Sequence, residues 1–96
     1  MDITNASEVA EQVLASVLKQ YSSNQPYRTV PVFDPASGNY LLMDEGWEKY
    51  QRIHRVWAHI EVRDGVFWIH EDGTEAGIAN RLIAAGVPRE RIVLAS

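Results

Sequence analysis

The sequence predicts a single α+β domain in which two helices pack against one antiparallel sheet. Apolar residues recur at helical spacing near both ends of the 96-residue chain, and the segment between them is rich in strand-forming residues. The pair Asp64-Gly65 lies between two alternating runs, as is typical of a two-residue type I′ hairpin turn. We therefore expect one domain over residues 1–96, with an N-terminal helix, a β-meander of about four strands, a second helix and a short C-terminal strand.

The first helix should run from about Ser7 to Tyr21, and Thr4, Asn5 and Ser7 are the candidate capping residues. Its apolar stripe has residues every four positions and two leucines beside them: Val9, Val13, Val17, Tyr21, Leu14 and Leu18. Such a stripe indicates core packing, because helix stability comes mostly from burying an apolar face.

The second helix should follow residues 71–73, with Thr74 or Asp72 as its N-cap and Glu75 in its first turn. It should end at Gly86, since glycine is favoured just beyond a helix and Pro88 blocks continuation. Its buried stripe is expected to be Ile78, Ala79, Leu82 and Ile83, and the last strand Ile92–Leu94.

The first two strands are expected over Tyr27–Phe33 and Asn39–Trp47, joined by a turn at 34–38. Pro31 has no N–H group to donate, which favours an edge position for the first strand. A weaker turn at 48–50 precedes a long third strand over Gln51–Arg63.

The turn at 64–65 sets the pairing of the third and fourth strands. One apolar face should contain the pairs Val62–Phe67 and Ile60–Ile69, with Ala58 and Val56. The other face should contain Arg63–Val66, Glu61–Trp68 and His59–His70, with Trp57 next along it.

Composition excludes several classes of protein. The chain has no cysteine, so it has neither disulfides nor thiolate metal sites, and it shows no apolar leader or membrane span; a cytoplasmic location is expected. No nucleophile motif or phosphate-binding loop occurs, which argues against an enzyme and against a cofactor. The net charge of −4 disfavours autonomous DNA binding, so any link to DNA is expected to be indirect.

The tryptophan–histidine side of the sheet is the candidate functional surface. Exposed tryptophan beside charged residues is typical of interfaces, so we predict a partner or oligomer interface at Trp57, His59, Glu61, Trp68 and His70. The alternative is that a helix covers this side and both indoles belong to the core. Neighbouring imidazoles with Glu61 also suggest a metal or small-molecule site, although no fourth ligand or known metal spacing is present. Lys49, Arg52 and Arg55 form a weak candidate for nucleic-acid contact.

The stretch from about Tyr27 to Leu94 resembles the XisI family, named for the fdxN element excision controlling factor. The resemblance depends on the order and spacing of several short motifs: Tyr40-Leu41-Leu42, Gly46-Trp47, Arg52, His59-Ile60, Asp64-Gly65, Trp68-Ile69, Asp72-Gly73-Thr74-Glu75, Ile78-Ala79, Leu82, Gly86-Val87-Pro88 and Ile92-Val93-Leu94. Family members usually continue past this strand with a tail, whereas the printed sequence ends at Ser96.

The resemblance implies a non-catalytic accessory protein that controls site-specific DNA excision in cyanobacteria together with XisH, a nuclease-related partner. It implies no catalytic residues. Three hypotheses follow: an XisI-type regulator that self-associates and binds an XisH-like protein; an antitoxin-like inhibitor of a nuclease-like partner; and a metal or small-molecule module at His59 and His70.

Overall fold

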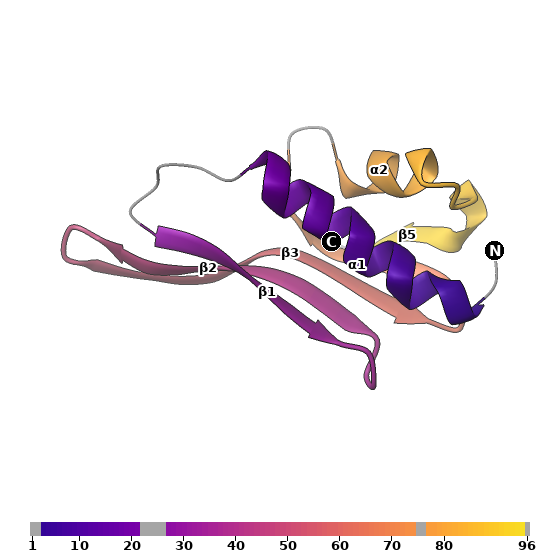
Figure 1. The fold of residues 1–96 in the computed structure, drawn as a ribbon, viewed down its shortest axis with the longest axis horizontal. Helices are drawn as coiled ribbons and strands as arrows, with labels where there is room; N and C mark the ends of the chain where they lie inside the picture. The colour runs from indigo at the N-terminus through magenta and orange to yellow at the C-terminus, as the bar shows by residue number, and fades with distance from the viewer. Residues whose placement is uncertain (1–2, 22–26, 75–76, 96) are drawn as a thin grey trace.

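The computed structural model describes residues 3–21, 27–74 and 77–95. Two helices form one layer and a five-stranded sheet forms the other (Figure 1). In chain order the elements are α1 (Ile3–Gln20), β1 (Tyr27–Asp34), β2 (Asn39–Glu48), β3 (Gln51–Arg63), β4 (Val66–Asp72), α2 (Ile78–Ala84), a 3₁₀ turn (Arg89–Arg91) and β5 (Ile92–Leu94).

The strands lie in the order β1-β2-β3-β4-β5. The first four form the predicted antiparallel meander, and β1 with its Pro31 occupies the predicted edge. The short C-terminal strand joins β4 in parallel, because the chain crosses over through α2 before returning to the sheet. The sheet is therefore mixed.

Both helices cover the same face of the sheet (Figure 1). The core between the layers combines the alternate inward residues of β2, β3 and β4 with the apolar stripes of α1 and α2. Its fully buried members include Tyr40, Leu42, Ala58, Ile60, Phe67, Ile69, Leu14, Val17, Ile78 and Leu82.

Helix α1 begins one turn earlier than predicted, so the three proposed capping residues lie inside it. The buried face of α1 also includes Ala6 and Ala10. Their small side chains do not stand out in an apolar stripe of valines and leucines.

Helix α2 also starts differently. Its N-cap position is Gly77, and the Asp72 carboxylate at the end of β4 accepts the Ile78 N–H from outside the helix at 2.8 Å. Glu75 lies outside the described residues. The C-terminal prediction is confirmed: Gly86 has φ 103° and donates to Ile83, while Val87 donates to Leu82, which is a Schellman ending.

Two β-bulges alter the predicted sheet faces. In β3, Leu42 pairs with Ala58 but Met43 pairs with Val56, so Trp57 is an extra residue. Because one extra residue reverses the alternation, Val56 faces away from the helices instead of joining the apolar face. The predicted Val62–Phe67 and Ile60–Ile69 pairs are confirmed.

Candidate functional site

The sheet surface opposite the helices, here called the open face, carries an aliphatic strip. Strand register places its five side chains in two adjacent rows across β1, β2 and β3: Val32 beside Leu41, and Val30 beside Met43 and Val56. Val32 is 44% exposed and Val56 is 38% exposed. Contiguous exposed apolar patches are typical of interaction surfaces, so the strip is a candidate for one.

The strip was not predicted, although the sequence holds a signal for it. Residues 40–43 are four consecutive apolar residues in one strand. Because successive residues of a strand point to opposite faces, such a run makes both faces apolar.

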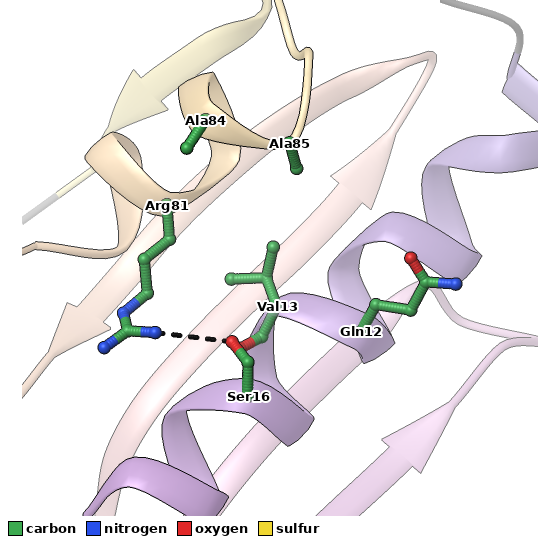
Figure 2. Close-up of a pocket in the computed structure, with 6 residues that line it drawn as sticks. All are labelled: Gln12, Val13, Ser16, Arg81, Ala84 and Ala85. Atoms are coloured by element: carbon green, nitrogen blue, oxygen red, sulfur yellow. Dashed lines mark hydrogen bonds between the residues drawn. The ribbon is translucent and has the colours of Figure 1, made fainter.

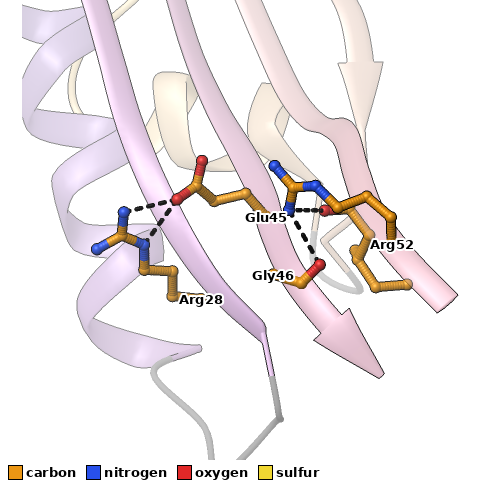
Figure 3. Close-up of polar contacts among 5 residues, drawn as sticks. Arg28, Glu45, Gly46 and Arg52 are labelled. Carbon is orange, nitrogen blue, oxygen red and sulfur yellow. Dashed lines mark hydrogen bonds and ion pairs between the residues drawn. The ribbon is translucent and has the colours of Figure 1, made fainter. Parts of the chain in front are cut away.

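One end of the strip, here called the arm end, lies toward the β2–β3 hairpin tip, which projects beyond the helices in Figure 1. Arg28 donates to Glu45 through Nε at 2.9 Å and Nη2 at 2.6 Å (Figure 3). This hydrogen-bonded guanidinium lowers the pKa of the Glu45 carboxyl. Arg52 lies 5.9 Å from the Trp47 ring centre and donates to backbone carbonyls, including that of Gly46 at 3.0 Å.

The other end, here called the body end, contains the histidine patch, defined as His59, Glu61, Trp68 and His70. The two imidazole rings lie 4.7 Å apart between centres, at an interplanar angle of 38°. His70 Nε2 is 2.9 Å from Glu61 Oε1, and His59 Nε2 is 2.9 Å from the side-chain amide oxygen Oδ1 of Asn39. Arg63, which follows the patch in β3, lies 4.5 Å above the Trp68 ring.

The patch shifts the titration of two of its members. Burial, followed by the neighbouring His70, lowers the pKa of His59, while Glu61 acts in the opposite direction. The hydrogen bond from His70 is the main cause that lowers the pKa of Glu61. The patch therefore favours an ionised Glu61 and a neutral His59.

Four of the five predicted interface residues form this patch, but Trp57 does not belong to it. Its ring lies 5.4 Å from Tyr21 of α1 in an edge-on arrangement, and it packs against the core on the helix side. The β3 bulge turns Trp57 to that side. The predicted direct pairing of the two histidines is also wrong, because His59 pairs with Glu71 and the β4 bulge leaves His70 as the extra residue.

The three basic residues proposed for nucleic-acid contact do not share one surface. Lys49 is in the β2–β3 turn with φ 59°, and Arg52 lies on the open face. Arg55 pairs with the buried Asp44 at 3.3 Å and donates to the Tyr27 hydroxyl at 3.3 Å, on the helix side of the sheet.

Asp44 is a carboxylate on the helix-covered side of the sheet. It lies within β2, is 4% exposed and accepts a hydrogen bond from Thr29 at 2.8 Å. Its position two residues after Leu42 in an alternating strand is the signal that would have placed it on the buried face.

No three His, Asp or Glu side chains within 3–21, 27–74 and 77–95 form a group able to hold a metal ion. A shallow hollow of 320 Å³ lies between α1 and α2 (Figure 2), and beside it Arg81 donates to Ser16 at 3.3 Å and also to Gln20. These contacts hold the two helices together.

None of the helices in the described part of the chain has the length and apolar character of a membrane span. The fold is a two-layer α+β domain whose helices cover one face of the sheet and leave the other uncovered. The family described as XisI protein matches residues 1–96. The chain belongs to the XisI family.

Two solved structures share the fold. A XisI-like protein from Anabaena variabilis ATCC 29413 is 29% identical, with a TM-score of 0.88 over 97% of this chain and 85% of that one. The fdxN element excision controlling factor XisI from the same organism is 21% identical, with a TM-score of 0.83 over 97% of this chain and 91% of that one. Among proteins of curated function, none matches.

Proposed function

We propose that this protein is a non-catalytic accessory factor of the XisI type, which controls site-specific DNA excision through protein contacts made by its open face. Family membership over residues 1–96 is the observation that carries the proposal. A solved structure of the same fold is described as a fdxN element excision controlling factor, which suggests regulation and not catalysis.

The open face supports a role through protein contact. It offers an aliphatic strip with polar groups at both ends, the composition of an interface core and its rim. Two of its polar contacts are made within the chain: Arg28 forms an ion pair with Glu45, and His70 is hydrogen-bonded to Glu61.

Direct DNA binding has weaker support. The chain carries a net charge of −4, and one of its three candidate basic residues, Arg55, is paired with a buried carboxylate. Neutralisation of phosphates by Lys and Arg is the main source of nonspecific DNA affinity. The DNA contacts are therefore assigned to a partner, which we expect to be an XisH-like, nuclease-related protein.

The test is an excision assay on a plasmid carrying a recombination site, with the XisH-like protein and the recombinase present. Adding this chain should raise the excised fraction, and Trp68→Ala should reduce that effect. Ile83→Ala, on the helix layer, is the matched control and should leave it unchanged. Suppression of the partner's activity would instead support an antitoxin-like inhibitor, and the absence of any effect would refute the proposal.

A further inference from the structure

We infer that the partner that covers the open face is a second copy of this chain, packed face to face about a two-fold axis that runs across the strands. The inference rests on the proposed function in taking the open face as the contact surface, and it names the occupant. In such a dimer, the arm end of each copy lies over the body end of the other.

The aliphatic strip supplies the centre of the contact. Two sheets that pack face to face interdigitate the side chains of their inner faces. The strip lies between the two polar ends, so a two-fold axis in the interface plane brings one strip onto the other.

The distribution of charge on the open face favours a second copy as the partner and favours one orientation of the two copies. On the arm end, Arg28 and Arg52 stand against one carboxylate, Glu45. On the body end, strand register places three carboxylates, Asp34, Glu61 and Glu71, against one arginine, Arg63. The arm end is therefore net positive and the body end is net negative.

This distribution makes the face complementary to itself in one orientation. A two-fold axis across the strands places each positive end over a negative end, whereas an axis along the strands places like charge over like charge. A uniformly basic or acidic partner would be attracted at one end of the face and repelled at the other. A second copy is attracted at both ends.

The first test measures oligomeric state by sedimentation equilibrium for matched variants. Val56 in the strip and Ile83 on α2 are both branched aliphatic residues, exposed by 38% and 37%, on opposite layers. Wild type and Ile83→Lys should be dimers at micromolar concentration. Val56→Lys should weaken the dimer at least tenfold while its far-UV circular dichroism stays unchanged, and Val32→Lys provides a second strip variant if Val56→Lys fails to fold.

The second test determines the orientation. The chain has no cysteine, so single-cysteine variants give unambiguous cross-links. An equimolar mixture of Arg52→Cys and Arg63→Cys, treated with a short bismaleimide, should yield mainly the mixed cross-link, because arm end meets body end. Predominant cross-linking of Arg52→Cys to itself would refute the orientation.

A monomeric wild type, or a Val56→Lys variant that dimerises like wild type, would overturn the inference. These failures are distinguishable from failure of the proposed function. A monomer that still stimulates excision would refute the dimer and support the proposed function. A dimer without any effect on excision would support the dimer and refute the proposed function.

Discussion

Alanine substitutions at Gly38 and Gly86 separate a backbone preference from a steric contact. Both glycines have positive φ, 77° and 103°. A Cβ added at Gly38 would lie 2.3 Å from the Val62 carbonyl oxygen, whereas a Cβ at Gly86 would have no heavy-atom neighbour within 4 Å. The two variants therefore share the cost of left-handed backbone and differ in the clash.

The shared cost is about 1–2 kcal/mol, the penalty for an L-residue in the left-handed region. At Gly38 the strands must also separate by about 1 Å to reach ordinary contact, which costs about 1–3 kcal/mol as overpacking. That movement stretches the 2.7 Å hydrogen bond from the Val62 N–H to the Gly38 carbonyl, worth about 1 kcal/mol. Gly38→Ala should thus destabilise by about 2–4 kcal/mol more than Gly86→Ala.

Urea unfolding followed by tryptophan fluorescence measures the difference. With an m value near 2 kcal/mol/M, within the usual range of about 1–3, the two midpoints should differ by about 1–2 M. All variants must be compared at one protein concentration, because dimerisation stabilises the folded state by mass action. Equal midpoints for the two variants would refute the steric reasoning, since only the shared backbone cost would then remain.

Three further predictions concern the two faces of the sheet. Trp57→Ala should lower the free energy of unfolding by about 2 kcal/mol or more, because the ring packs on the core. Trp68→Ala should lower it by less than about 1 kcal/mol. Equal decreases in the two variants would contradict the assignment of the two rings to different faces. Asp44→Asn should cost about 1–2 kcal/mol, since its carboxylate is buried and hydrogen-bonded, and an unchanged urea midpoint would contradict this. Lowering the pH from 7 to 5 should destabilise the protein, because the unfolded His59, with a pKa near 6.5, takes up a proton that the folded, pKa-lowered His59 resists. His59→Gln should flatten this part of the stability–pH curve, and an unaltered slope would assign the dependence to other groups.

Local chemistry in the sequence predicted most of the fold. Asp64 and Gly65 have φ values of 53° and 75°, as a type I′ turn requires, and Gly86 ends α2 as predicted. These signals are readable because each depends on a few adjacent residues whose backbone preferences are strong. Four of the five residues predicted as an interface lie together in the histidine patch, and their role as an interface stays a prediction. The aliphatic strip was not predicted.

The misplaced residues share one cause. Strict alternation assigned Val56 to the core and Trp57 to the open face, and the bulge in β3 reversed both. The bulge inserts Trp57 as an unpaired residue and turns its ring toward Tyr21 of α1. The alternation of apolar and polar residues, from which the faces were predicted, holds only for a regular strand.

The sequence by itself determined the element order, the turns and the single domain, because backbone preferences and apolar periodicity are local properties. Only the tertiary structure decided that both helices share one face and that the other face presents an aliphatic strip between a positive and a negative end. Strand register and layer packing bring these residues together, and both result from minimising exposed apolar surface over the whole chain.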